Sequence, residues 1–166
     1  INIAAKTVSV LYKDLMYLTL EHEKANQDEV IKIKELIYNR AEYFAVLAQS
    51  KHIECNLDLE DATITMDKRK LTRVIDNLIS NAIKYNKRKG TVGIKLRDGM
   101  LVIWDTGIGM EEDKIPFMFD RYMRFNNSEG GFGVGLSIVK NILDEYGISI
   151  KVESKVGEGT RMVLVW

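Results

Sequence analysis

The first part of the chain carries apolar residues at alternating steps of three and four positions, the seam of a helix that packs against partner helices. The seam residues are Ile1, Ala4, Val8, Leu11, Leu15 and Leu18. A polar stretch over 21–29 follows, and we expect the helix to end near Glu23. Because the chain starts inside this pattern without an initiator Met, we interpret it as the cut end of a longer protein.

A second amphipathic helix is predicted to open the globular domain, again with apolar residues three or four positions apart. They are Val30, Ile33, Ile37, Ala41, Phe44 and Ala48. Alternating apolar residues then predict a half-buried strand over 52–59 and a short strand over 62–66. Asp67 is placed to cap the next helix, whose apolar face begins at Leu71 and which ends near Asn86.

The second half of the chain predicts two hairpins with a helix between them. The expected elements are strands over 91–97 and 100–104, a helix over 134–146, and strands over 148–153 and 160–166. Asp98-Gly99 is a strong hairpin signal, and Gly157-Glu158-Gly159 marks the second turn. The order of elements fits a mixed sheet covered by helices on one face, an α/β two-layer sandwich preceded by a bundle-type helix.

Composition excludes several classes of protein. The 166 residues include 24 Lys plus Arg and 24 Asp plus Glu, so no overall charge draws the chain to nucleic acid or to anionic lipid. The longest apolar run, 43–48, is far shorter than the roughly 20 residues of a membrane helix. The single cysteine, Cys55, cannot form an internal disulfide; we expect it in the core and the chain in the reducing cytoplasm.

Glycine and proline are confined to one part of the sequence. All 12 glycines lie between Gly90 and Gly159, and the only proline is Pro116. The first part is therefore suited to regular structure. The glycine-dense segment 105–135 is predicted to be the loop-rich functional region.

One helix carries a polar stripe beside its apolar face. Asn77, Asn81 and Lys84 are spaced i, i+4 and i+7, so two amides and an ammonium share one side. Amide oxygens suit Mg²⁺, and a lysine can neutralise phosphate. The alternative is an ordinary polar helix flank.

Two glycine strings suggest close approach of the backbone to a ligand. Asp105-Thr106-Gly107-Ile108-Gly109-Met110 places a carboxylate at a strand end, although a plain glycine turn with a surface Asp explains the string equally. The string 130–136, GGFGVGL, opens a helix whose amides could receive phosphate. It is neither a P-loop nor a dinucleotide fingerprint, and a structural glycine loop stays an alternative.

Four strings in this order support a family resemblance: NLISNAIKY (77–85), DTGIGM (105–110), FDRY (119–122) and GGFGVGLSIVK (130–140). They resemble the N-box, G1-box, F-box and G2-box of the catalytic ATP-binding domain of sensor histidine kinases. That domain has the Bergerat fold of the GHKL superfamily. We therefore assign 26–166 to this domain. The first helix is similar to the C-terminal helix of the dimerisation and phosphoacceptor domain, to which we assign 1–25.

The resemblance implies ATP and Mg²⁺ as ligands. Asn81 would coordinate the Mg²⁺ on the triphosphate with Asn77 nearby, and Lys84 would contact phosphate. Tyr85 would stack along adenine, and Asp105 would accept a hydrogen bond from its amino group. The further nucleotide-binding residues implied are Gly107, Gly109, Met110, Phe119, Gly131, Phe132, Gly133, Val134, Gly135, Leu136 and Thr160.

The resemblance also implies a lid over about residues 111–130, with Phe119 and Arg124 at its start. Arg124 joins Asn81 and Lys84 as the implied catalytic residues. Gly131, Gly133 and Gly135 would form the hinge and the phosphate cradle.

The implied activity is a protein histidine kinase. The γ-phosphate of ATP would pass to a histidine on an adjacent helix outside this chain, leaving ADP, and then to an aspartate of a response regulator. GHKL hydrolases carry a water-activating glutamate at the position of Asn77, which cannot act as a general base. His22-Glu23 matches only the first two letters of the H-box, so we expect His22 to be a seam or surface residue.

The intact kinase is expected to be a homodimer, attached to a membrane only through missing N-terminal regions. We expect no autophosphorylation of this chain alone. Two other functions stay open: a GHKL-type ATPase or anti-sigma serine kinase, and a non-catalytic interaction module.

Overall fold

The computed structural model describes residues 3–21, 24–120 and 135–166. The helices are α1 (Ile3–Met16, continued by a π-helical turn over Tyr17–Glu21), α2 (Ile33–Ser50), α3 (Lys68–Lys84), a 3₁₀ helix (Glu112–Phe117) and α4 (Gly135–Glu145). The strands are β1 (Asp28–Lys32), β2 (Glu54–Leu59), β3 (Thr63–Asp67), β4 (Thr91–Arg97), β5 (Met100–Asp105), β6 (Ser149–Lys155) and β7 (Gly159–Val165).

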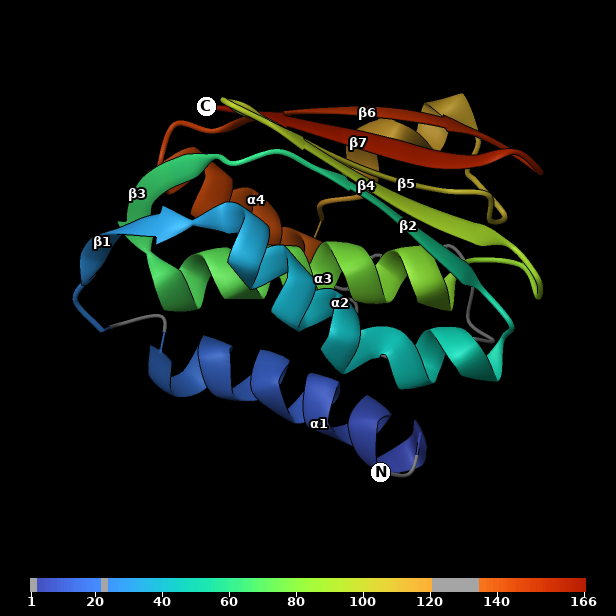
Figure 1. The fold of residues 1–166 in the computed structure, drawn as a ribbon, viewed down its shortest axis with the longest axis horizontal. Coiled ribbons are helices and arrows are strands. Elements are labelled where there is room, and N and C mark those ends of the chain that lie inside the picture. Colours follow the sequence, from blue (N-terminus) through green and yellow to red (C-terminus); the bar gives the residue numbers. More distant parts are fainter. Residues whose placement is uncertain (1–2, 22–23, 121–134) are drawn as a thin grey trace.

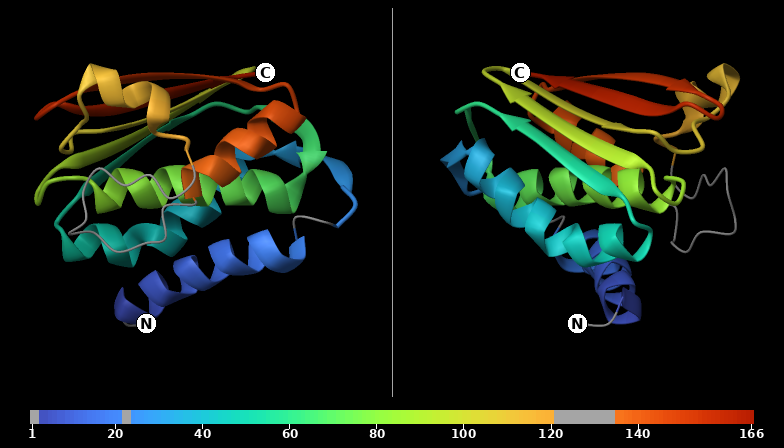
Figure 2. Two further views of the ribbon diagram at one scale, coloured as in Figure 1. Left: turned by 180° about the vertical axis from the view of Figure 1, so that it is seen from behind. Right: turned by 45° about the vertical axis from the view of Figure 1, so that its right-hand side comes forward.

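The architecture is the predicted two-layer α/β sandwich. A five-stranded sheet forms one layer, helices α2, α3 and α4 cover one of its faces, and α1 lies on the far side of this helix layer (Figure 1, Figure 2). The strand order is β2-β4-β5-β7-β6; β2 and β4 are parallel and the other neighbours antiparallel, so the sheet is mixed. Both predicted hairpins, β4–β5 and β6–β7, are confirmed.

The start of the second helix was predicted wrongly. Val30 belongs to strand β1, which pairs antiparallel with β3, and α2 begins only at Ile33. The Val30 side chain is 69% exposed because β1 forms a two-stranded ribbon apart from the main sheet. Its apolar spacing to Ile33 was therefore a coincidence of sequence.

Helix α3 is the central helix of the layer and has a defined start and end. The Asp67 carboxylate accepts the Arg69 backbone N–H at 2.9 Å, which is the predicted N-cap. At the other end, the Lys51 ammonium donates to the Lys84 carbonyl at 2.6 Å, so a cation lies at the negative end of the helix dipole. Between these ends the apolar face is buried against the sheet and α4.

Helix α1 packs against the helix layer through a small polar and aromatic contact. The Arg73 guanidinium of α3 donates to the Asp14 carboxylate at 3.0 Å and to the Lys13 carbonyl at 2.7 Å. Tyr17 is buried under the same guanidinium. The seam residues Val8 and Leu15 are exposed.

The prediction that Cys55 lies in the core is wrong. Cys55 is exposed, because it lies on β2, an edge strand of the five-stranded sheet. Burial of part of the side chain raises the pKa of its thiol. Within the described ranges, no helix combines the length and apolar character needed to cross a bilayer.

Candidate functional site

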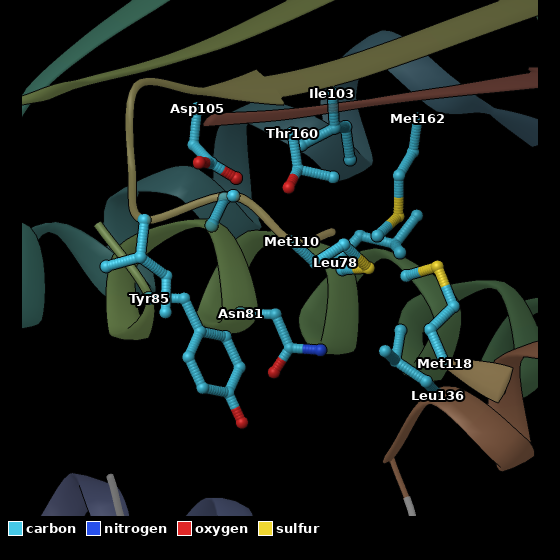
Figure 3. Close-up of a pocket in the computed structure, with 13 residues that line it drawn as sticks. Leu78, Asn81, Tyr85, Ile103, Asp105, Met110, Met118, Leu136, Thr160 and Met162 are labelled. Atoms are coloured by element: carbon cyan, nitrogen blue, oxygen red, sulfur yellow. The ribbon is translucent and has the colours of Figure 1, made fainter. Parts of the chain in front are cut away.

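A pocket of about 90 Å³ lies between α3 and the inner face of the sheet (Figure 3). Seven of the residues proposed from the sequence line it: Asn81, Tyr85, Asp105, Gly109, Met110, Leu136 and Thr160. Asp105 and Thr160 project from the sheet, and they are faced by Asn81 of α3 and by Tyr85, the residue that follows this helix. The pocket thus has polar groups from both layers around one cavity.

Asp105 is the acid of the pocket. It ends β5, a central strand of the sheet, and pairs with Thr160 on β7. Burial raises the pKa of Asp105 to about 6, although hydrogen bonds from the backbone amides of Gly107 and Thr160 act in the opposite direction. The Gly107 amide donates to Asp105 Oδ1 at 2.8 Å. The carboxylate is therefore oriented by backbone donors and still offers acceptor lone pairs to a ligand.

The chain after Asp105 turns back onto the end of α3. The Ile108 amide donates to the Tyr85 carbonyl at 3.0 Å, and a Cβ at Gly107 would overlap that same carbonyl. The Thr106 hydroxyl donates to Asn86 Oδ1 at 3.2 Å. Glycine is thus required at 107 by a close backbone approach, and the loop is fixed to the helix that carries Asn81.

The two other polar residues on α3 lie beside the pocket without lining it. The Lys84 ammonium lies 5.0 Å from the centroid of the Tyr85 ring, at the same end of the helix as the pocket. Asn77 is buried; its Nδ2 donates to the Arg73 carbonyl at 2.8 Å, and its Oδ1 faces the start of α4 at Gly135. The predicted stripe is thus split between two environments.

Three more of the proposed residues lie next to the pocket. Gly107 and Gly135 are held against α3, and Phe119 packs on the hydrophobic core. The remaining proposed residues lie outside the described residues: Arg124, Gly131, Phe132, Gly133 and Val134. His22 lies outside them as well.

Sequence reasoning missed most of the apolar wall of the pocket. The additional lining residues are Leu78, Ala82, Ile103, Ile108, Met118 and Met162. Their spacing is that of ordinary core positions, so no local signal separates them from the core. The only pointer was their position next to the polar residues on α3, β5 and β7.

The described part of the chain contains no group of three His, Cys, Asp or Glu side chains that could hold a metal ion. The Asn81 amide offers a hard oxygen donor on the α3 side of the pocket. Mg²⁺ commonly takes only one or two protein ligands, completing its shell with phosphate oxygens and water. One amide beside a polyanion therefore fits Mg²⁺, whereas a metal held by protein ligands alone does not fit.

Residues 66–166 match the family model described as histidine kinase-, DNA gyrase B- and HSP90-like ATPase. The chain is 37% identical over 113 residues to the sensor histidine kinase YkoH of Bacillus subtilis, covering 64% of this chain and 25% of YkoH. It is 32% identical over 167 residues to the sensor histidine kinase RppB of Synechocystis, covering 93% of this chain and 37% of RppB. The chain thus spans about a quarter to two fifths of these relatives.

The fold is also similar to that of a solved structure, the mycobacterial sensor histidine kinase MprB. The two share 27% sequence identity and superpose with a TM-score of 0.72, over 84% of this chain and 96% of the MprB chain. The sequence and fold comparisons therefore point to the same group of proteins.

Proposed function

Because the chain belongs to the family of histidine kinase-, DNA gyrase B- and HSP90-like ATPases, we propose that it is the ATP-binding catalytic domain of a sensor histidine kinase. The pocket carries this proposal: the half-buried Asp105 carboxylate faces Asn81 and Tyr85 across an apolar cavity. The similarity to kinases such as YkoH and RppB favours a kinase over the other members of the family.

In this proposal the adenine base enters the apolar part of the pocket. Its amino group donates to Asp105, whose ionised carboxylate is already held by two backbone amides. The thioether and aliphatic side chains of the wall contact the faces of the base, and Tyr85 lies along it. Burial of the base supplies affinity, and the carboxylate selects the 6-amino group.

The phosphate end lies toward Asn81 and Lys84. The Asn81 amide oxygen would hold Mg²⁺, which when bound neutralises part of the phosphate charge. The Lys84 ammonium, close to the Tyr85 ring, would contact a phosphate oxygen. Gly135 opens α4, and Leu136 in its first turn lines the pocket, so the end of α4 that stabilises an anion lies beside the pocket.

The chemistry is transfer of the γ-phosphoryl group to an imidazole nitrogen of a histidine on another helix. The new P–N bond forms as the P–O bond to ADP breaks, and ADP leaves. This chain holds the nucleotide in position, and Asn77, an amide bonded to its own helix, supplies no general base. The phosphoryl group then passes to an aspartate of a response regulator.

We assign residues 1–25 to the end of the dimerisation and phosphoacceptor domain, and 26–166 to the catalytic domain. The exposed seam of α1, with Val8 and Leu15 outward, supports a helical partner in the whole kinase. A homodimer, a cytoplasmic position and membrane attachment through other parts of the protein belong to the same proposal.

Isothermal titration with Mg²⁺-ATP tests the binding step. We expect a dissociation constant of millimolar or tighter, and a loss of affinity corresponding to about 1–3 kcal/mol in Asp105→Asn, because an amide nitrogen then opposes the adenine amino group. A flat titration of the folded chain would reject the proposal.

Radiolabelled ATP tests the transfer step. We expect label on a version extended N-terminally through the H-box and none on this chain alone. Equal labelling of the two would instead identify an acceptor inside this chain, with His22 the first to examine.

A further inference from the structure

The inward face of β6 carries a polar side chain where the strand pattern calls for an apolar one. Ile150, Val152 and Ser154 alternate on the half-buried face, and their neighbours along the strand are exposed. Ser154 pairs directly with Thr160 on β7. A hydroxyl at a core-facing position needs partners, because an unbonded buried polar group is costly.

Ser154 has three hydrogen-bonding neighbours around its one hydroxyl. Its Oγ accepts the Met110 backbone N–H at 2.9 Å, donates to the Gly159 carbonyl at 3.1 Å, and lies 2.8 Å from Thr160 Oγ1. Two of these partners, Met110 and Thr160, line the pocket. Ser154 itself does not line the pocket, so it can influence a ligand only through them.

Only one assignment of the Ser154 and Thr160 hydroxyl hydrogens makes all three contacts hydrogen bonds. A serine hydroxyl offers one hydrogen and two acceptor lone pairs. The Gly159 carbonyl can only accept, so the Ser154 hydrogen points to it, and Ser154 accepts from Met110 and from Thr160. The Thr160 hydrogen is then directed at Ser154, and the lone pairs of Thr160 Oγ1 are left for the pocket.

Thr160 then acts as a hydrogen-bond acceptor, as the neighbouring Asp105 does. Asp105 and Thr160 project side by side from the sheet toward α3 (Figure 3). A pair of acceptors fits the two hydrogens of a 6-amino group. The same pair repels a 6-carbonyl, which a freely rotating threonine hydroxyl would otherwise accommodate by donating to it.

We propose that Ser154 is a positioning residue for purine selectivity, which holds Thr160 as an acceptor beside Asp105 and so favours 6-amino over 6-oxo purine nucleotides. This role rests on the proposed binding of ATP. Ser154 also anchors Met110 by accepting its backbone N–H. The loop 107–110 runs against the β6–β7 turn, where the Gly157 amide donates to the Ile108 carbonyl at 2.8 Å.

Binding of Mg²⁺-ATP and Mg²⁺-ITP, which carries a carbonyl at position 6, tests the proposal. For wild type we expect a clear preference for ATP. In Ser154→Ala the ATP-to-ITP affinity ratio should fall about fivefold to tenfold, the effect of one hydrogen bond. Ser154→Thr keeps the hydroxyl and should keep the ratio within about twofold of wild type.

Two further variants separate positioning from general destabilisation. Ser149→Ala makes the same change on an exposed position of β6, where the hydroxyl bonds only the Val165 carbonyl among the contacts described, and should leave the ratio unchanged. The double variant Ser154→Ala with Thr160→Val should show the ratio of Thr160→Val alone, since Ser154 acts through Thr160.

The outcomes distinguish this inference from the function beneath it. If wild type binds neither nucleotide, both the role of Ser154 and the proposed ATP binding are rejected. Wild type that prefers ATP, with a ratio unchanged in Ser154→Ala or with both affinities reduced equally, overturns the role of Ser154 and leaves ATP binding standing. Equal binding of both nucleotides by wild type also overturns it.

Discussion

The Asp14 carboxylate of α1 and the Arg73 guanidinium of α3 lie 3.0 Å apart, with their side chains only 9% and 11% exposed. This pair joins the N-terminal helix to the helix that carries the pocket residues. Arg73 also donates to the Lys13 carbonyl and covers Tyr17. Burial raises the pKa of Asp14 even though Arg73 lies beside it.

Asp14→Ala should release α1 from the helix layer. The substitution leaves the Arg73 charge buried without its carboxylate, which costs about 1–3 kcal/mol. We expect faster amide hydrogen exchange over residues 8–16, by about tenfold or more, with α3 still protected.

The exposed pair Arg97–Asp58 provides the control. Their side chains are 27% and 63% exposed, so Asp58→Ala should change stability little and leave α1 exchange unaltered. Unchanged exchange in Asp14→Ala would mean that the apolar contacts of α1 hold the helix by themselves.

The pH dependence of nucleoside binding should reflect Asp105. Because burial raises the pKa of Asp105 to about 6, the carboxyl is mostly protonated at pH 5 and mostly ionised at pH 7. Only the ionised form offers all its lone pairs to the adenine amino group. Affinity should therefore rise about tenfold between pH 5 and pH 7.

Adenosine is the suitable ligand for this measurement, followed by NMR titration, because it lacks phosphates that titrate in the same range. Asp105→Asn should bind more weakly with a flat pH profile. A wild-type profile that is flat over the same range would contradict the elevated pKa.

Asp67 should make folding sensitive to acid. Burial opposes its charged form, but hydrogen bonds from the Arg69 side chain and from the Gln27 and Arg69 amides lower the pKa of Asp67 to about 2. A carboxyl with a lowered folded-state pKa stabilises the fold above its ordinary pKa near 3.8, and that stability is lost as the pH falls through about 2.

Asp67→Asn keeps a capping oxygen without the charge. Urea unfolding at pH 7 should show it about 1–2 kcal/mol less stable than wild type, and the difference should shrink as the pH falls from 4 toward 2. Asp144→Asn, on an exposed face of α4, should show no comparable difference at pH 7. If the stability difference between wild type and Asp67→Asn stays constant across the pH range, the effect of Asp67 comes from the geometry of the helix cap and not from its charge.

Gly109→Ala should damage the pocket more than Gly157→Ala. Both glycines have positive φ, +61° and +80°, so alanine is strained at each by about 1–2 kcal/mol. At Gly109 the new Cβ would also overlap the Lys155 carbonyl, whereas at Gly157 no atom of the described residues lies within 4 Å, its chain neighbours aside.

We expect Gly109→Ala to lose about 3 kcal/mol or more and to bind ATP weakly, because the loop that bears Met110 has to move. Gly157→Ala should keep most of its nucleotide affinity. Urea unfolding measures the loss of stability and calorimetric titration the loss of ATP affinity. Equal losses in both variants would show that backbone strain alone causes them.

Local signals predicted the elements that depend on local sequence. The Asp67 cap and the apolar face from Leu71 define α3, and Asp98-Gly99 defines the β4–β5 hairpin. Strand β1 escaped prediction because it exists through pairing with β3, in which Val30 lies opposite Thr65 and stays exposed. Pairing between distant segments leaves no periodic trace in a short polar strand.

The polar residues of the pocket could be predicted from the sequence, whereas most of its apolar wall could not. Asn81, Tyr85, Asp105 and Thr160 were named from the sequence and meet around one pocket. Met118 and Met162 form its wall but are indistinguishable from core residues in the sequence. Ser154 was likewise invisible, since its importance comes from three neighbours that the fold brings together.

The ribbon of β1 and β3 has a mechanical consequence. β1 ends at Lys32 and α2 starts at Ile33, and β3 ends at Asp67 and α3 starts at Lys68, so neither junction contains slack. The Gln27 amide, on the path from α1, donates to Asp67 at 2.9 Å. A pull or twist on the chain before β1 would therefore act on the first turn of α3. Asn81 and Lys84 lie about three and a half to four and a half turns farther along the same helix.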